Sequence, residues 1–139
     1  MRVESEQLGV IEVEETKIIR LPDGLLGFPE ITRFALIEAS DDGTYFWLQA
    51  LDNPELSFLS LIPWGFFPDY EPEISDADQA VLELDSPEHA LVLCLITISD
   101  DAVTANLLGP VIINSISGTG RQIVLERTDY STRAELAQL

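Results

Sequence analysis

Short runs of apolar and β-branched residues recur along this chain of 139 residues, each separated from the next by turn-forming residues. The clearest runs cover residues 8–13, 17–21, 33–38, 45–51, 56–62, 89–98, 106–114 and 122–126. Runs of this length separated by Asp-Gly and Asn-Pro pairs are typical of strands joined by tight turns. The sequence therefore predicts a mainly β fold, an antiparallel β-barrel-like or sandwich domain, with residues 8–13 and 17–21 as its first hairpin.

One segment has helical spacing instead. Ser75 has the chemistry of an N-cap, Asp76 and Asp78 place negative charge in the first turn, and apolar residues then recur at helical spacing up to Leu84. We expect one short helix over residues 76–85. No repeat, low-complexity segment or linker divides the chain, so we expect residues 1–139 to form a single domain.

Acidic residues outnumber basic ones by 25 to 7, which gives a formal net charge of −18. A surface of this sign repels a phosphate backbone, so direct nucleic-acid binding is excluded. The sequence lacks a signal-peptide pattern and a long apolar run, which predicts a cytoplasmic protein without a membrane span. The single cysteine, Cys94, rules out an intrachain disulfide and a zinc site built from thiolates.

Positive charge is missing from the middle of the chain. No lysine or arginine lies between Arg33 and Arg121, and the 87 residues between them carry 15 acids and only His89 as a possible cation. Ion pairs within the chain therefore cannot neutralise most of these carboxylates. The unpaired field either serves solubility or steers a basic protein partner onto the surface.

Candidates for catalysis are few. His89 follows Glu88, which would orient a general base, but a solvent-facing histidine beside its counter-charge explains the pair equally well. Cys94 lies in the apolar run 91–96, where we expect a buried and unreactive thiol. We expect no enzymatic activity and no cofactor.

Aromatic and acidic residues are interleaved from Phe66 to Asp78, a segment that we call the acid-aromatic ridge. Its acids are suitable calcium ligands, but their spacing lacks the glycine of a calcium-binding loop, so we expect no metal site. The aromatic residues either close the core or anchor a basic partner. We expect the following residues to contact a partner: Phe66, Phe67, Asp69, Tyr70, Glu71, Glu73, Asp76 and Asp78.

Three segments resemble the FliW family of bacterial flagellar assembly factors. They are the loop at residues 24–30 (GLLGFPE), the aromatic stretch at 63–70 and, most specifically, residues 104–114 (TANLLGPVIIN). Residues 122–125 and 130–133 follow in the matching order, so the resemblance extends almost end to end. The chain departs from the family pattern after residue 133 and at Gly109, where the family has alanine.

Within these segments we expect structural roles for Gly27, Phe28, Asn106, Pro110 and Asn114. The Asn106 side chain can bond backbone groups where a strand begins. Pro110 cannot donate to a ladder and therefore predicts an edge or a bulge within residues 106–114.

The resemblance implies a small cytoplasmic β-barrel-like binding protein without catalytic activity, monomeric when unbound. Proteins of this family bind newly made flagellin. They also bind the RNA-binding translational regulator CsrA and prevent it from repressing flagellin mRNA. Alternatives from other classes are a small β-barrel ligand-binding protein or an enzyme of unknown substrate, and an acidic structural subunit.

Overall fold

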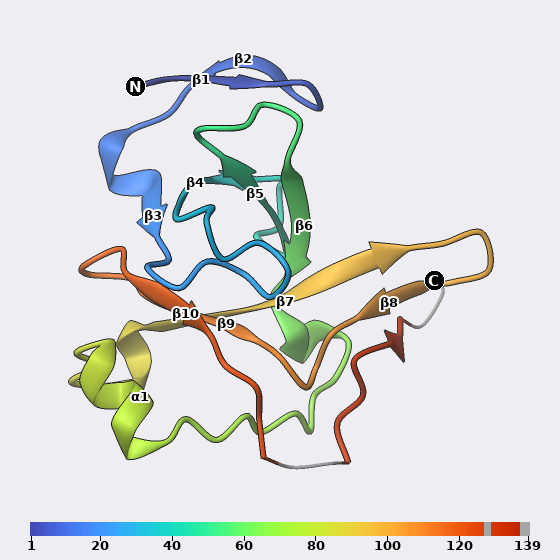
Figure 1. Cartoon of the computed structure of the whole chain (residues 1–139). Helices are drawn as coiled ribbons and strands as arrows, with labels where there is room; N and C mark the ends of the chain where they lie inside the picture. Colours follow the sequence, from blue (N-terminus) through green and yellow to red (C-terminus); the bar gives the residue numbers. More distant parts are fainter. Residues whose placement is uncertain (127–128, 137–139) are drawn as a thin grey trace.

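The computed structural model describes residues 1–126 and 129–136, and its fold is mainly antiparallel β, as predicted (Figure 1). The strands are β1 Arg2–Ser5, β2 Gly9–Glu12, β3 Ile18–Arg20, β4 Arg33–Glu38, β5 Tyr45–Ala50, β6 Ser57–Leu61, β7 Ala90–Ile98, β8 Val103–Ala105, β9 Val111–Asn114, β10 Gly120–Gln122 and β11 Ala134–Glu135. One α-helix, α1 (Asp76–Val81), accompanies three short 3-10 turns, η1 (Glu15–Lys17), η2 (Pro63–Gly65) and η3 (Pro87–His89). No helix among the described residues is long and apolar enough to cross a membrane.

The main sheet has the strand order β10-β9-β7-β6-β5-β4-β3, and every neighbouring pair is antiparallel. It curves until its two ends meet. There, the Arg20 amide donates to the Gly118 carbonyl at 2.8 Å, and a single parallel bridge joins Arg20 to Thr119. The sheet is thus barrel-like, but no continuous ladder closes it.

The predicted first hairpin is wrong. β2 pairs with β1, with Val3 opposite Ile11, while β3 pairs with β4 in the main sheet. The segment Arg2–Ser5 alternates exposed and buried side chains as an edge strand does, a signal that the longer apolar runs obscured. The turn η1 redirects the chain between β2 and β3, so the two predicted partners belong to different sheets.

Helix α1 begins as predicted but ends earlier than the predicted residue 85. The Ser75 hydroxyl accepts a hydrogen bond from the Asp78 amide at 3.1 Å, which makes Ser75 the N-cap. Glu83 has a φ of 53°, in the left-handed region that ends helices. The Asn114 side chain fixes this end by donating to the carbonyls of Leu82 at 2.9 Å and Glu83 at 3.2 Å.

Residues 106–114 do not form the one predicted strand, because only β9 (Val111–Asn114) and the preceding β8 pair with β7. On β7, Ile96 pairs with Ala105 of β8 and Leu93 pairs with Val111 of β9. Two residues of β7 separate these pairs, whereas five residues connect β8 to β9, so the connection holds three extra residues. We call residues 106–110 the β8–β9 bulge.

The β8–β9 bulge leaves β7 and follows the chain after β10. Ile123 donates from its amide to Pro110 O at 2.9 Å, and Leu125 donates to Leu108 O at 2.8 Å. These bonds keep the register of β10 with β9, so the ladder continues as far as Leu125. The predicted strand 122–126 therefore has its regular part earlier, at Gly120–Gln122, and an irregular extension beyond it.

Strands β7 and β9 separate the two larger core clusters. On β7, Leu93 packs inside the curved sheet with Phe34 and Leu48, whereas Cys94 faces the opposite cluster with Leu61. Side chains on successive strand residues point to opposite faces, so both faces of β7 are buried. The predicted burial of Cys94 is confirmed.

Candidate protein-binding surface

The acid-aromatic ridge connects η2 to α1 without regular secondary structure between Phe66 and Ser75. In Figure 1 it is the green segment that crosses the lower part of the molecule toward α1. Two hydrogen bonds fold its start. The Phe67 amide donates to Pro63 O at 2.8 Å, and the Trp64 indole donates to Tyr70 O at 2.9 Å. The beginning of the ridge is therefore a fixed turn.

Tyr70 lies in the core, with only 3% of its surface exposed. Its hydroxyl donates to Leu107 O at 2.6 Å, and its ring meets that of Tyr130 edge-on, with the centroids 4.8 Å apart. Burial raises the pKa of Tyr70 well above its usual range. Tyr70 is therefore not the exposed anchor that the sequence predicted, and Phe66 and Phe67 are half-buried against the same cluster.

The ridge borders separate concavities rather than one continuous patch, and two of them contain the predicted partner residues. The first, of about 550 Å³, is lined by residues 66–71 together with Leu107, Asp129 and Tyr130. The second, of about 390 Å³, lies between residues 73–78 and residues 123–126. Phe66, Phe67, Asp69 and Glu71 thus border a different hollow from Glu73, Asp76 and Asp78.

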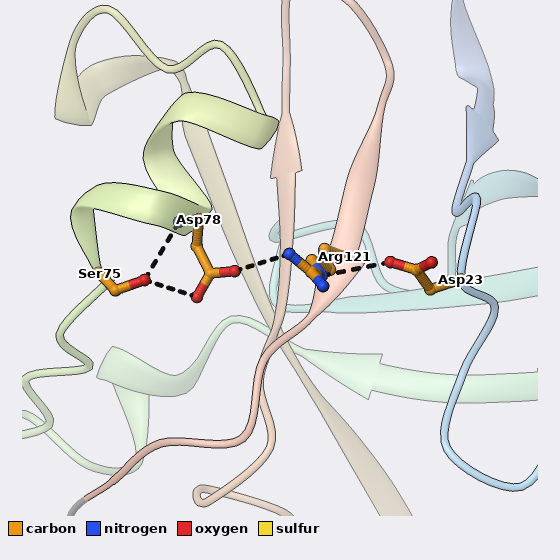
Figure 2. A network of polar contacts seen from close by, with 4 residues as sticks. All are labelled: Asp23, Ser75, Asp78 and Arg121. Carbon is orange, nitrogen blue, oxygen red and sulfur yellow. Dashed lines mark hydrogen bonds and ion pairs between the residues drawn. The ribbon is translucent and has the colours of Figure 1, made fainter.

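Asp78 is already paired within the chain (Figure 2). Its carboxylate lies 3.0 Å from the guanidinium of Arg121 and accepts a hydrogen bond from the Ser75 hydroxyl at 2.9 Å. Arg121 also pairs with Asp23 at 3.3 Å, so one arginine joins the turn before the 24–30 loop to helix α1. The negative charge of Asp78 is therefore less available to a partner than that of its neighbours.

Most of the other acids keep their charge unpaired. Of the 15 acids between Arg33 and Arg121, only Asp52 and Asp78 form ion pairs, with those two arginines, so 13 have no such partner among the described residues. The exposed ridge carboxylates Asp69, Glu71, Glu73 and Asp76 belong to this group. The negative field expected from the sequence is thus present at the surface.

The candidates for catalysis and metal binding are not assembled into a site. Within residues 1–126 and 129–136 no ion pair or hydrogen bond joins the His89 ring to Glu88, and no three potential ligands are grouped for a metal ion. Burial raises the pKa of the Cys94 thiol to about 12, although a hydrogen bond with Tyr70 acts in the opposite direction.

The 24–30 loop depends on Gly24. Its φ is 67°, and a Cβ atom there would lie 2.3 Å from Phe28 O. Gly27 also has positive φ but faces open space, and the Phe28 ring packs edge-on against Phe58 at 5.2 Å. The loop is therefore a tight, internally packed turn on the sheet.

Asn106, Pro110 and Asn114 are part of the main-chain packing around the β8–β9 bulge and the end of α1. Asn106 accepts from the Gly109 amide at 2.9 Å inside the β8–β9 bulge, and Pro110 is fully buried where the bulge ends. Asn114 joins the end of α1 to the β9–β10 turn, where it accepts from the Ile116 amide at 2.9 Å. These contacts are consistent with the structural roles expected for the three residues.

Sequence reasoning missed several contributors to the surface. Leu107 and Tyr130 line the first hollow, Val124 and Glu126 line the second, and Arg121 fixes the wall between α1 and β10. Arg121 had a signal, since it is the first base after a long base-free stretch. Tyr130 had a signal only in the 130–133 segment of the family resemblance, because its contact with Tyr70 joins residues far apart in the chain.

Comparisons with known proteins agree with this architecture. The sequence model of the FliW protein family matches residues 2–136. The flagellar assembly factor FliW of Natranaerobius thermophilus is 42% identical over 98% of this chain and 92% of its own length. That of Treponema pallidum is 40% identical over 99% of this chain and 95% of its own length. A crystal structure of the flagellar assembly factor FliW superposes with a TM-score of 0.89 at 30% identity, covering 99% of this chain and 98% of the other.

Proposed function

Because this chain belongs to the FliW family of flagellar assembly factors, we propose that it binds newly made flagellin and the translational regulator CsrA. Binding would keep CsrA from repressing flagellin mRNA, and flagellin would release CsrA when it occupies the protein. Secretion of flagellin then feeds back on flagellin synthesis. In this proposal residues 1–139 act as one cytoplasmic domain, monomeric when unbound, without catalytic activity or a cofactor.

One observation carries the CsrA part of the proposal. The exposed carboxylates Asp69, Glu71, Glu73 and Asp76 have no ion-pair partner among the described residues, and two of them, Asp69 and Glu71, share a hollow with half-buried aromatic rings. An RNA-binding regulator must expose basic surface to meet phosphates, and such a surface is complementary to this one. Phe66 and Phe67 would supply the apolar contact at the edge of the charged patch.

The test uses purified CsrA and a variant that reverses three ridge charges, Glu71→Lys, Glu73→Lys and Asp76→Lys. Asp78 stays unchanged because its carboxylate pairs with Arg121. We expect the wild-type association rate to fall as salt rises, since screening shortens to about 8 Å at physiological ionic strength. The triple variant should associate about tenfold more slowly at low salt and lose most of the salt dependence.

A matched control carries the same charge change on the N-terminal segment, Glu4→Lys, Glu6→Lys and Glu15→Lys, all of them exposed. Circular dichroism establishes that both variants are folded. If the control variant associates slowly with CsrA and the ridge variant associates at the wild-type rate, the contact lies at the N-terminal acids and not at the ridge. Size-exclusion chromatography tests the partners themselves. Failure of a mixture with CsrA or with flagellin to give a heteromeric peak would contradict that half of the proposal.

A further inference from the structure

The chain that continues β10 has one unpaired edge. The amides of Ile123 and Leu125 point toward the β8–β9 bulge and donate to Pro110 and Leu108. In an antiparallel strand the intervening residues direct their N–H and C=O groups to the opposite side. The main-chain groups of Val124 and Glu126 have no hydrogen-bond partner among the described residues, so this stretch is an open sheet edge.

The second concavity lies along this open edge. Its volume is about 390 Å³, and its far wall is the stretch from Glu73 to Asp76, which makes no main-chain hydrogen bond to residues 123–126. Val124 is 57% exposed within it. Figure 1 shows the red-orange chain after β10 descending on the side of the sheet where α1 lies, and the green ridge segment crossing its lower part. We call this space the edge groove.

The edge groove is negatively charged and its walls are fixed. Glu73, Asp76 and Glu126 line it with exposed carboxylates that have no ion-pair partner among residues 1–126 and 129–136. The Asp78–Arg121 pair ties the α1 wall to β10 at 3.0 Å (Figure 2). A ligand therefore meets a prearranged edge, which lowers the ordering cost of binding.

We propose that the edge groove binds an extended peptide segment that adds as a strand to the edge at Val124–Glu126 and carries Lys or Arg at alternate positions. Unpaired main-chain donors and acceptors in a row are satisfied by another extended backbone, as in other strand-addition complexes. Alternate side chains of the added strand point the same way, so basic residues at that spacing can all face the three carboxylates. The inference goes beyond the proposed function, because it concerns the mode of binding and not which protein supplies the segment.

The first experiment uses a short synthetic peptide of alternating Lys and Val and follows amide hydrogen exchange in the full chain. We expect exchange at Val124 and Glu126 to slow by about tenfold or more at saturation, because these amides gain carbonyl partners. The same peptide with N-methyl groups at alternate residues keeps its charge but blocks the backbone bonds. It should bind about tenfold more weakly, and a Glu-Val peptide should not bind.

A protein variant tests the same edge. Val124→Pro removes one main-chain donor that has no partner in the unbound protein, whereas Val124→Thr keeps the donor and a β-branched side chain. We expect the proline variant to lose about tenfold in peptide affinity and the threonine variant to match the wild type. If the proline variant does not fold, the comparison of methylated and unmethylated peptides on the wild-type protein decides the question.

Equal affinity for the methylated peptide, or unchanged exchange at Val124 and Glu126 at saturation, would overturn the strand-addition proposal. Either result would leave only charge attraction at this surface. The outcome is separate from that of the proposed function. A folded Val124→Pro protein that still binds CsrA leaves the function standing. The ridge-charge variant changes two groove carboxylates, Glu73 and Asp76, so strand addition is decided by the methylated peptide on the wild-type protein, where every charge is kept.

Discussion

The Tyr70 hydroxyl donates a 2.6 Å hydrogen bond to the main-chain oxygen of Leu107. This bond joins the acid-aromatic ridge to the β8–β9 bulge, two segments that are far apart in the sequence and that both carry the family resemblance. Leu107 O accepts no other hydrogen bond among the described residues. The position of Tyr70 within the ridge is therefore fixed by the main chain of the β8–β9 bulge. The two motifs thus form one structural unit.

Replacing Tyr70 with Phe should destabilise the fold while leaving its ring contacts in place. The variant leaves the buried Leu107 carbonyl without a donor, which costs about 1–3 kcal/mol in free energy of unfolding. Urea denaturation monitored by circular dichroism measures the change. Tyr45→Phe is the matched control, since the Tyr45 hydroxyl makes no hydrogen bond among the described residues. Equal loss in both variants would contradict the importance of the Tyr70–Leu107 bond.

Asn106→Ala should lower stability without abolishing partner binding. The buried Gly109 amide would lose its acceptor, at a cost of about 1–3 kcal/mol. Asn106→Asp retains an acceptor oxygen at the same position and should recover most of the stability. Thermal unfolding and CsrA association are measured on both variants. An alanine variant with unchanged melting temperature and lost binding would show that Asn106 contacts a partner directly.

Local pattern was sufficient for much of the fold. The apolar run and its bounding turn residues predict the strand at 33–38, and capping chemistry predicts the N-cap at Ser75, because each depends on neighbours in sequence. The first hairpin failed because pairing is a long-range choice. Residues 17–21 are an adequate strand by pattern, but burial of Ile19 in the main core places them beside β4.

The surface was predictable in charge but not in shape. Composition alone indicated the unpaired acids, since a long base-free stretch cannot neutralise them. Composition did not indicate that the buried Tyr70 hydroxyl bonds to Leu107 O, or that Asp78 pairs with Arg121, a residue 43 positions away. Composition likewise did not indicate the edge groove. The β8–β9 bulge pairs with Ile123 and Leu125 on one side of the chain after β10, and the opposite side, at Val124 and Glu126, has no main-chain partner among the described residues.

The Asp78–Arg121 pair should contribute more to stability than the Asp23–Arg121 pair. The Asp78 side chain is 20% exposed and that of Asp23 is 69% exposed, so water screens the second interaction more. Exposed ion pairs contribute about 0–1 kcal/mol. Double-mutant cycles with Arg121→Gln against Asp78→Asn and against Asp23→Asn give the two coupling energies. A coupling to Asp23 as large as that to Asp78 would refute the ranking.

Cys94 should make the fold less stable at alkaline pH. Burial raises the pKa of its thiol to about 12 in the folded protein. In the unfolded chain the thiol has the ordinary cysteine pKa of about 8.5. Between these values the unfolded state binds fewer protons than the folded state, so the free energy of unfolding falls as pH rises. Below that range the contribution is fully present.

Urea denaturation at several pH values between about 7 and 11 should therefore show a steep decline for the wild-type protein. Cys94→Ala should show a shallower one, because the variant lacks the titrating thiol but keeps Tyr70, whose pKa is also raised by burial. The alanine variant should lose stability at neutral pH through the cavity it creates, and the difference from wild type should shrink as pH rises.

A thiol reagent at neutral pH should label Cys94 far more slowly in the native protein than in denaturant, because the thiolate is scarce and access requires opening of β7. Parallel pH profiles for the two proteins, together with rapid native labelling, would place the thiol in an accessible site instead of the core.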